Sequence, residues 1–240
     1  MRILLIGYGK MGREIESLAT AKGHTIVGSI TRDNASQLLD YNGDNTDVAI
    51  EFTEPSGAAH NISHCLTNHI PVLSGTTGWL DQFDEMVALA KENEGRFFYA
   101  SNYSIGVNLF FKVNRQLARL MADQEYRVAV EEIHHTQKKD APSGTAITLA
   151  EGIIEEQARY TSWQLDKASG QNIIPIKAIR EDQVPGTHTI TYSSEVDTID
   201  IRHTAHSRKG FAQGALMIAE WLVSQKPGHY SMDDYLNELK

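Results

Sequence analysis

Three closely spaced glycines near the start of the chain constrain its fold more than any other feature. The apolar segment Arg2 to Ile6 predicts a buried strand, and it is followed in the spacing G-x-G-x-x-G by Gly7, Tyr8, Gly9, Lys10, Met11 and Gly12. In this spacing the first glycine permits a tight turn, the second lets a pyrophosphate approach the backbone, and the third lets a helix pack closely on the strand. The pattern predicts a βαβ unit that binds a dinucleotide at the start of its helix.

The alternation of strands and helices continues beyond this first unit. Helices are expected at about 10–22, 55–68 and 80–94, and strands at about 25–30, 48–52, 70–73 and 96–99. Right-handed crossovers wind such a chain into one doubly wound parallel sheet. We therefore expect a Rossmann-type α/β domain that binds a dinucleotide over residues 1–104.

The second half of the chain alternates less regularly. A helix at about 106–121 leads to a strand at about 126–134, and another helix runs from Ser143 to about Arg159. Three later segments, at about 173–180, 187–192 and 198–204, are rich in β-branched residues. They predict a mixed or antiparallel sheet, hence a second α+β domain over residues 105–210. The helical remainder, residues 211–240, is expected to pack back on the first domain.

Charge and cysteine content narrow the partners and the compartment. The 240 residues carry a formal net charge of −9, and an acidic surface repels nucleic acid and anionic membranes, so neither is expected as a partner. Cys65 is the one cysteine, which excludes an internal disulfide. No apolar stretch has the length of a membrane span or of a signal-peptide core. We expect a cytoplasmic protein without a metal centre.

The end of the second strand bears on which dinucleotide is bound. An acidic residue there accepts hydrogen bonds from the adenosine ribose in many such domains, but this chain has Thr31, Arg32 and Asp33. Arg32 suits the 2′-phosphate of NADPH, whereas Asp33 suits NADH, so NADPH, NADH or both are expected. Two further loops follow strands at the edge where this fold binds ligands. They supply the candidate cofactor contacts Gly75, Thr76 and Thr77, and Ala100, Ser101, Asn102 and Tyr103.

Residues suited to proton transfer gather in one segment of the second half. His134 and His135 end a strand, and because strand residues alternate faces, one can be catalytic and the other supportive. Lys138 follows within reach of the same pocket. The next helix then begins with a capping hydroxyl and backbone amides that can bind a carboxylate. The segment predicts a proton donor beside a site for an acidic substrate, the latter formed by Ser143, Gly144 and Thr145.

The segment from Glu131 to Ala146 closely resembles the signature of the 4-hydroxy-tetrahydrodipicolinate reductase family, also called dihydrodipicolinate reductases. It contains His-His-x-x-Lys-x-Asp-Ala-Pro-Ser-Gly-Thr-Ala. Further matches are Gly-Tyr-Gly-Lys-Met-Gly at 7–12, Gly-Thr-Thr-Gly at 75–78, Asn-Tyr-Ser-Ile-Gly-Val-Asn at 102–108, Ala-His-Ser-Arg at 205–208 and Phe-Ala-Gln-Gly-Ala at 211–215. The resemblance spans nearly the whole chain.

The resemblance implies a reaction and a role for each matching residue. Family members use NADH or NADPH to reduce the cyclic imine made from 4-hydroxy-tetrahydrodipicolinate to (S)-2,3,4,5-tetrahydrodipicolinate, toward diaminopimelate and lysine. It implies that His134 is the acid/base, that Lys138 is a second proton donor, and that the substrate contacts are His135, Gly144 and Thr145. A histidine that titrates near neutrality suits protonation of the enamine that hydride transfer leaves.

The resemblance also bears on the cofactor and on assembly. The implied cofactor contacts are Arg32 and the residues at 7–12, 75–77 and 100–103, and the family suggests a homotetramer built through the sheet of the second domain. This chain departs from the commoner pattern at two points. Thr31 replaces the ribose-binding acid, and the segment between Asp33 and Asp47 is short. Cofactor preference is therefore open.

Three other interpretations compete with this one. Another two-domain NAD(P)-dependent dehydrogenase shares the nucleotide-binding half but gives no reason for the His-His segment. A non-catalytic NAD(P)-sensing protein needs no proton donor. His60, His64 and Cys65 offer too few aligned ligands for a metal ion, and a polar helix face is the simpler explanation for them.

Overall fold

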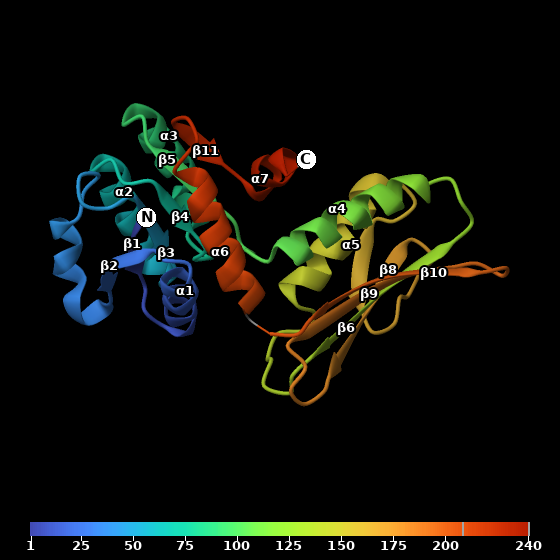
Figure 1. The fold of residues 1–240 in the computed structure, drawn as a ribbon. Coiled ribbons are helices and arrows are strands. Elements are labelled where there is room, and N and C mark those ends of the chain that lie inside the picture. Colours follow the sequence, from blue (N-terminus) through green and yellow to red (C-terminus); the bar gives the residue numbers. More distant parts are fainter. Residues whose placement is uncertain (208, 240) are drawn as a thin grey trace. The chain divides into compact units, whose positions relative to one another are not determined.

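The chain divides into two compact units in the computed structural model, which describes residues 1–207 and 209–239. The first unit comprises Met1–Ile105 and Lys209–Lys240, so the C-terminal segment of the chain returns to the N-terminal one. The second unit is Gly106–Arg208 (Figure 1). Arg208, which belongs to one of the family motifs, and Lys240 lie outside the described residues.

The first unit is built on a six-stranded parallel sheet. Its strands are β1 (Arg2–Ile6), β2 (Thr25–Ile30), β3 (Val48–Glu51), β4 (Val72–Ser74), β5 (Arg96–Tyr99) and β11 (Gly228–Tyr230). They lie in the order β11-β5-β4-β3-β1-β2. The chain passes from β1 to β2 on one side and then crosses to β3 on the other side of β1. The carboxyl end of β1 is therefore the switch point at which such sheets bind ligands.

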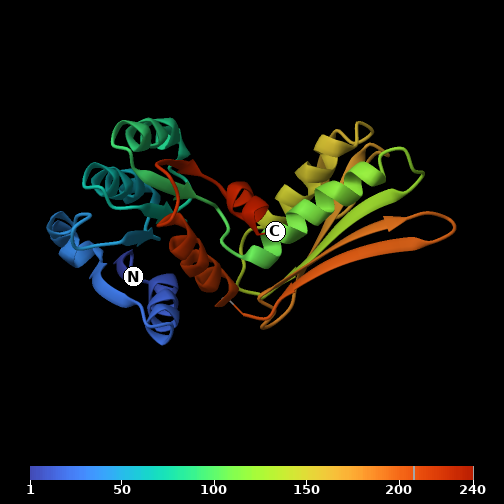
Figure 2. The same ribbon diagram turned by 45° about the horizontal axis from the view of Figure 1, so that its top comes forward.

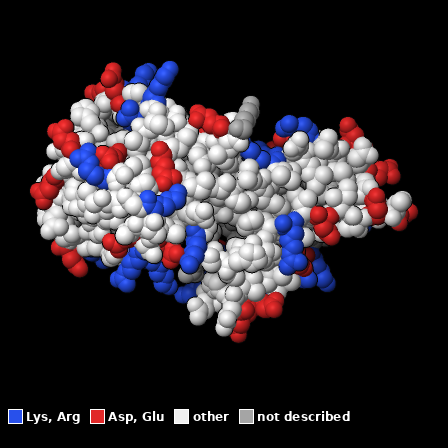
Figure 3. Space-filling view, in the orientation of Figure 1, with Lys and Arg blue, Asp and Glu red and all other residues white. Residues whose placement is uncertain are grey.

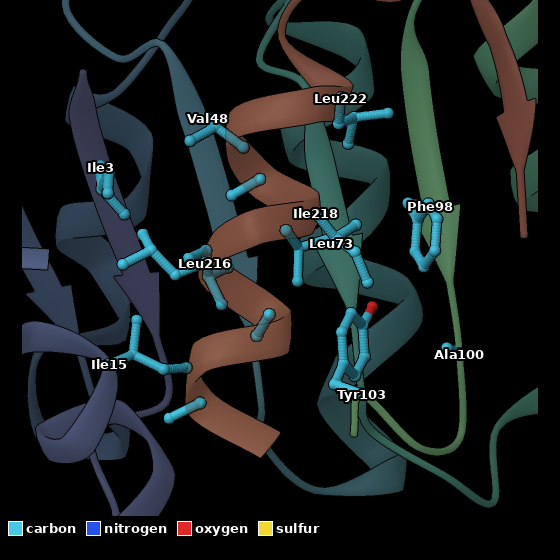
Figure 4. Close-up of a cluster of buried hydrophobic side chains, with 14 of the residues drawn as sticks. Ile3, Ile15, Val48, Leu73, Phe98, Ala100, Tyr103, Leu216, Ile218 and Leu222 are labelled. Atoms are coloured by element: carbon cyan, nitrogen blue, oxygen red, sulfur yellow. The ribbon is translucent and has the colours of Figure 1, made fainter. Parts of the chain in front are cut away.

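Helices cover both faces of this sheet because strand residues alternate. Ile3 and Leu5 of β1 face one core and Leu4 and Ile6 the other. The first core contains side chains of α1 (Lys10–Ala21), α6 (Lys209–Leu222) and α7 (Met232–Glu238). The second contains side chains of α2 (Pro55–Thr67) and α3 (Phe83–Glu92). Figure 4 shows how Leu216, Ile218 and Leu222 of α6 lie against the sheet.

The second unit is a five-stranded mixed sheet with two helices on one face (Figures 1 and 2). Its strands are β6 (Arg127–His134), β7 (Ser162–Leu165), β8 (Ile173–Arg180), β9 (Gly186–Ser193) and β10 (Thr198–Ala205), in the order β10-β9-β6-β8-β7. Strand β6 pairs parallel with β8 and antiparallel with β9. The helices α4 (Ile105–Leu120) and α5 (Gly144–Glu156) bury an apolar core against this sheet, in which Leu149 and Ile153 of α5 join Val128 and Val130 of β6.

The predicted fold class is confirmed, because a parallel sheet with alternating helices precedes a mixed sheet. Three elements were not predicted: the 3-10 helix η1 (Arg32–Asp40), β7 and β11. Strand β11 has three residues and adds to β5 at the edge of the sheet, so its own sequence carries little signal. The helix expected at 80–94 begins as the 3-10 helix η2 (Leu80–Gln82) and becomes α-helical at Phe83.

Within residues 1–207 and 209–239, no helix combines the length and the apolar character that crossing a membrane requires. The face shown in Figure 3 carries side chains of both charges. Lys and Arg are interspersed there with Asp and Glu.

Gly214 sets how closely α6 approaches the chain at Tyr103. A Cβ at residue 214 would lie 1.8 Å from the Tyr103 carbonyl oxygen, so a side chain must displace backbone. We predict that Gly214→Ala lowers the free energy of unfolding by about 1–3 kcal/mol, as overpacking does, in chemical denaturation. Gly210→Ala in the same helix is the control, because a Cβ there would meet its nearest neighbour, Ser104 Oγ, at 3.8 Å. Equal losses in the two variants would contradict the packing argument.

Candidate functional site

The glycine-rich turn after β1 leaves room for an anion at the start of α1. Gly7 has a φ of 97°, which favours glycine, and a Cβ there would lie 1.9 Å from the Phe52 carbonyl oxygen. A Cβ on Gly12 would lie 2.4 Å from the Gly7 carbonyl oxygen, so α1 packs tightly on the turn. By contrast, nothing lies within 4 Å of a Cβ built on Gly9. The backbone at Gly9 is open beside the N-terminus of α1, as close approach of a pyrophosphate requires.

A cavity of about 450 Å³ opens at this turn. It lies at the carboxyl ends of β1 and β2 and beside the start of α2, which follows β3. Its lining includes Gly7, Gly9, Thr31, Arg32, Thr53 and Glu54. This is the size of a small-ligand pocket at the switch point of the sheet, and these residues fit part of a dinucleotide.

Arg32 and Glu54 form an ion pair among the residues that line this cavity. Arg32 Nη2 lies 2.6 Å from Glu54 Oε2, and the side chains are 81% and 68% exposed. The pair joins the beginning of η1 to the residue that precedes α2. A guanidinium suited to a 2′-phosphate is thus already engaged by a carboxylate. Because the pair is exposed, it is weak enough for a phosphate to displace.

A fully buried carboxylate ties together the loops that follow β3 and β4. Glu51, the last residue of β3, has no exposed surface. Its carboxylate accepts hydrogen bonds from Ser74 Oγ at 2.6 Å, from Thr76 Oγ1 at 2.9 Å and from the Thr53 backbone N at 3.0 Å. Thr76 Oγ1 also accepts from the Thr53 backbone N at 2.8 Å. Glu51 therefore couples the loop at 75–77 to Thr53, which lines the cavity.

In the second unit, the end of β6 brings polar side chains together on its buried face. Glu132 and His134 continue the face that Val128 and Val130 begin, and they are 0% and 7% exposed. The register pairs Glu132 with His188 of β9 and His134 with Arg180 of β8. Side chains from three neighbouring strands therefore meet beyond the end of the apolar core. We call Glu132, His134, Arg180 and His188 the strand-end cluster.

The Glu132 carboxylate lies at the centre of the strand-end cluster. It accepts hydrogen bonds from the Ser143 backbone N, 3.1 Å from each oxygen, and from Arg180 Nη2 at 3.1 Å. Its Oε2 lies 3.5 Å from His134 Nδ1 and 3.8 Å from His188 Nε2. The two imidazole rings have centroids 5.0 Å apart and planes inclined by 72°. The cluster thus places a titratable imidazole beside a compensated carboxylate.

Helix α5 begins next to this carboxylate. Ser143 is its cap, as the sequence predicts, because Ser143 Oγ accepts a hydrogen bond from the Ala146 backbone N at 3.2 Å. The amides of Gly144 and Thr145 belong to the first turn, where backbone N–H groups have no partner within the helix. Nothing lies within 4 Å of a Cβ built on Gly144. The helix start is therefore open to a carboxylate at Gly144.

The loop between β6 and α5 carries the other predicted residues. Lys138 Nζ donates to the two carboxylate oxygens of Asp140 at 2.9 and 2.8 Å, so its ammonium is held within the loop. His135 directly follows the last residue of β6, and its Nδ1 is buried without a hydrogen-bond partner. The roles of His135 and Lys138 in substrate binding and proton donation stay predictions.

The two histidines of the strand-end cluster differ in electrostatics. Burial lowers the pKa of His134. The charges of Glu132 and Asp140 oppose this shift, whereas those of Lys138 and Arg180 add to it. Burial, reinforced by the charges of His134, His203 and Lys138, lowers the pKa of His188 to about 3. His188 is therefore neutral over the working range of most enzymes. His134 differs in that the carboxylates of Glu132 and Asp140 oppose the effect of burial on its pKa.

Glu132, His134 and His188 form a group of possible metal ligands among the described residues. Their ligand atoms lie within 4.8 Å of one another. The Glu132 carboxylate is already balanced by the Arg180 guanidinium and by the Ser143 N–H at a helix start, and both disfavour a cation. We assign no metal ion to the cluster.

The metal alternative on α2 gains no support from the geometry. Cys65 has no exposed surface, and burial raises the pKa of its thiol, which disfavours a thiolate ligand. His64 Nε2 lies 3.2 Å from the Tyr41 carbonyl oxygen, and His60 lines the cavity at the glycine turn.

Comparison with known proteins extends over both units. The family model described as dihydrodipicolinate reductase, N-terminus, matches residues 1–103, and that described as dihydrodipicolinate reductase, C-terminus, matches residues 106–236. The chain belongs to the dihydrodipicolinate reductase family. The 4-hydroxy-tetrahydrodipicolinate reductase of Christiangramia forsetii is 48% identical over 100% of this chain and 99% of that protein. The protein of the same name from Methanoregula boonei is 39% identical over 79% of this chain and 74% of its own.

Solved structures share the fold of this dihydrodipicolinate reductase family member. The dipicolinate-bound dihydrodipicolinate reductase from Paenisporosarcina sp. TG-14 has a TM-score of 0.78 at 24% identity, covering 96% of this chain and 97% of that one. An amine dehydrogenase from Mycobacterium smegmatis has a TM-score of 0.62 at 10% identity, covering 96% and 94%. The two-domain fold is thus shared with other dehydrogenases. The family matches over both halves decide against membership in a different dehydrogenase family.

The predicted cofactor contacts fall into two groups in this reductase-family chain. Gly7, Tyr8, Gly9 and Arg32 line the cavity. Lys10, Met11, Gly12, Asp33 and the loops at 75–77 and 100–103 are not among its lining residues. Tyr103 is a core residue whose hydroxyl donates to the Ser74 carbonyl oxygen at 2.7 Å. The role of each residue in binding stays a prediction.

Several residues of the two sites were not singled out from the sequence. Thr53 and Glu54 could have been, because they follow β3 as the loop at 74–78 follows β4, and loops after parallel strands form such sites. Arg180 and His188 could not, because their proximity to His134 follows from the pairing of β6 with β8 and β9. Local sequence does not reveal that register.

The Glu51 network predicts a linked loss of stability and cofactor binding. Glu51→Ala leaves the buried hydroxyl groups of Ser74 and Thr76 without their acceptor, which costs about 1–3 kcal/mol for each unsatisfied group. We expect a lower midpoint of thermal unfolding and a higher Kd for NADH in titration calorimetry. Glu92→Ala on the exposed surface of α3 is the control. Unchanged NADH affinity in a folded Glu51→Ala protein would show that Glu51 does not support the cofactor loops.

Proposed function

We propose that this chain is a 4-hydroxy-tetrahydrodipicolinate reductase. It converts 4-hydroxy-tetrahydrodipicolinate and NAD(P)H with a proton to (S)-2,3,4,5-tetrahydrodipicolinate, NAD(P)+ and water, a step toward diaminopimelate and lysine. Family membership supports this reaction. The observation that carries it is the strand-end cluster, in which His134 lies beside the Glu132 carboxylate that also binds the Ser143 amide at the open start of α5.

In this proposal the two units divide the work. The first unit binds the dinucleotide, with the α1 N-terminus and the open backbone at Gly9 holding the pyrophosphate. The bound cofactor supplies the hydride. The second unit binds the dicarboxylate through the amides of Gly144 and Thr145 at the start of α5, which Ser143 caps. His135 and Lys138 add further substrate contacts.

Proton transfer completes the reaction. Loss of water from the 4-hydroxy compound gives a conjugated imine, and addition of a hydride leaves an enamine that must take up a proton. His134 donates this proton, because the Glu132 carboxylate beside it favours the protonated ring and opposes the effect of burial, which lowers its pKa. Lys138 serves as a second proton donor and, as a cation, stabilises the negative charge that develops during transfer.

The experiment that tests the function is a spectrophotometric assay of NADH and NADPH oxidation with freshly generated 4-hydroxy-tetrahydrodipicolinate. We expect cofactor oxidation that depends on the imine. A non-catalytic NAD(P)-sensing protein would bind the cofactor without oxidising it. Binding without turnover would therefore refute the enzyme and favour that second candidate.

We infer that the chain uses both NADH and NADPH. Arg32 offers a guanidinium for a 2′-phosphate, which supports NADPH. Its partner Glu54 can instead accept hydrogen bonds from the ribose hydroxyls of NADH. Glu54 would then do the work of the ribose-binding acid, whose usual position is occupied here by Thr31. One exposed ion pair can thus bind either cofactor, and it discriminates little between NADH and NADPH.

We also propose a cytoplasmic homotetramer assembled through the sheet of the second unit. In β10 the side chains from Thr198 to Asp200 are exposed, and Ile199 is an exposed large apolar residue. Exposed apolar residues on a sheet are suited to contact with another subunit. Light scattering on the purified protein would test this, and a monomer at working concentrations would contradict it.

His134→Gln tests the proton donor. We expect turnover to fall by about a hundredfold or more, the usual contribution of a general acid, while the Kd for NADH changes little because the cofactor binds the first unit. Steady-state kinetics and fluorescence titration measure the two quantities. His69→Gln, an exposed histidine of the first unit, is the control. Unchanged turnover of His134→Gln would remove His134 from this role.

The Arg32–Glu54 pair predicts opposite changes in cofactor preference. Arg32→Ala removes the phosphate-binding guanidinium, so kcat/KM for NADPH falls more than that for NADH. Glu54→Gln frees Arg32 and weakens ribose binding, so the ratio of NADPH to NADH kcat/KM rises, by about fivefold or more if a charge-assisted pair is lost. Parallel kinetics with both cofactors measure the ratio. Equal effects on the two cofactors in both variants would contradict the assignment.

A further inference from the structure

Glu132 is a buried acid that neither transfers a proton nor binds substrate in the proposed reaction. It is fully buried although ionised carboxylates are costly to bury, so its position must be strongly compensated. The compensation comes from the Arg180 guanidinium and the Ser143 backbone N–H, while one oxygen, Oε2, also faces the two imidazoles. A residue held in this way links β6, β8, β9 and the start of α5.

The position of the His134 ring is fixed from two sides. Its Nδ1 lies 3.5 Å from Glu132 Oε2 and has no hydrogen-bond partner, so a charge interaction with the carboxylate holds this edge of the ring. The other edge lies against Gly186, where a Cβ would come within 3.1 Å of His134 Nε2. With Nδ1 turned toward Glu132, Nε2 is the nitrogen left to exchange a proton with substrate.

The charges around His134 come from every element packed against it. Glu132 on β6 and Asp140 in the following loop favour the protonated ring, and Lys138 in that loop and Arg180 on β8 disfavour it. His188 on β9 is neutral at working pH, because burial lowers its pKa to about 3. Burial itself disfavours the imidazolium. Of the two carboxylates that favour protonation, Glu132 has the larger effect, and because it has no exposed surface, solvent screens it least.

We propose that Glu132 is a positioning residue that keeps the His134 imidazole protonated and oriented, with Nε2 toward the substrate, and that anchors the start of α5 in the same arrangement. The inference rests on the proposed function, in which His134 donates the proton. Arg180 has the opposite effect on the protonation of His134. Its positive charge compensates Glu132 and so limits how strongly the carboxylate holds the proton on the imidazole.

Two variants with opposite expected effects test the proposal. Glu132→Gln removes the negative charge, and Arg180→Met removes a positive one. A general acid is active below its pKa, so the falling limb of the plot of kcat/KM for the imine against pH should move to lower pH in Glu132→Gln and to higher pH in Arg180→Met. On the falling limb, kcat/KM of Glu132→Gln should be about fivefold lower than that of the unmodified chain, whereas at low pH, where His134 is protonated in both, the two values should converge.

Glu131→Gln is the matched control. Glu131 is the neighbour of Glu132 in β6, its side chain is partly exposed, and it pairs with Lys177 instead of the cluster. Its pH profile should stay unchanged. In Glu132→Asp, which keeps the charge, the falling limb should lie between those of Glu132→Gln and the unmodified chain. A loss in Glu132→Gln that is equal at every pH would indicate a merely structural role and overturn the proposal.

An NMR titration of the His134 imidazole, assigned with His134→Gln, reads the same coupling without turnover. We expect its midpoint to move down in Glu132→Gln and up in Arg180→Met. If Glu132→Gln does not fold, an unmoved or lowered midpoint in Arg180→Met overturns the proposal by itself. If the midpoints move as expected but the unmodified chain does not oxidise NAD(P)H with the imine, the coupling stands and the proposed function fails.

Discussion

A carboxylate shielded from water must find its compensation within the protein, and each unit of this chain meets that requirement at its candidate site. Glu51 ends β3 and gathers the donors of the loops after β3 and β4, and Glu132 gathers donors from β8 and from the start of α5. Removing either acid would leave buried donors unpaired. The loops around both sites are therefore held by hydrogen bonds to one side chain each.

The second of these carboxylates bears most directly on chemistry. Strand β6 is apolar on its buried face up to Val130 and then presents Glu132 and His134. The backbone N–H of Ser143, the residue that caps α5, donates to the same carboxylate. The proposed proton donor and the proposed carboxylate site are thus adjacent, because Glu132 contacts both the strand end and the helix start. This geometry suits a small cyclic dicarboxylate that must be protonated while it is held.

The sequence predicted the parts of the molecule that local patterns encode. The glycine spacing at Gly7, Gly9 and Gly12 located the turn and its helix, and Ser143 was recognised as the cap of α5. The strand-end cluster depends instead on register, because Arg180 and His188 lie far from His134 in the chain. The Arg32–Glu54 pair likewise joins the beginning of η1 to the residue before α2, and no periodicity indicates it. No local pattern predicts that Glu51, an acid in a short strand, is fully buried.

The proposed reaction transfers a hydride from NAD(P)H to a cyclic imine and completes the reduction with a proton. Turnover of the imine with a reduced cofactor deuterated at the transferred position, followed by NMR of the product, tests it most directly. We predict one deuterium from the cofactor on a ring carbon and a solvent-derived hydrogen on the neighbouring carbon. Cofactor oxidation without deuterium in the product, or a product whose two new hydrogens both come from solvent, would contradict it.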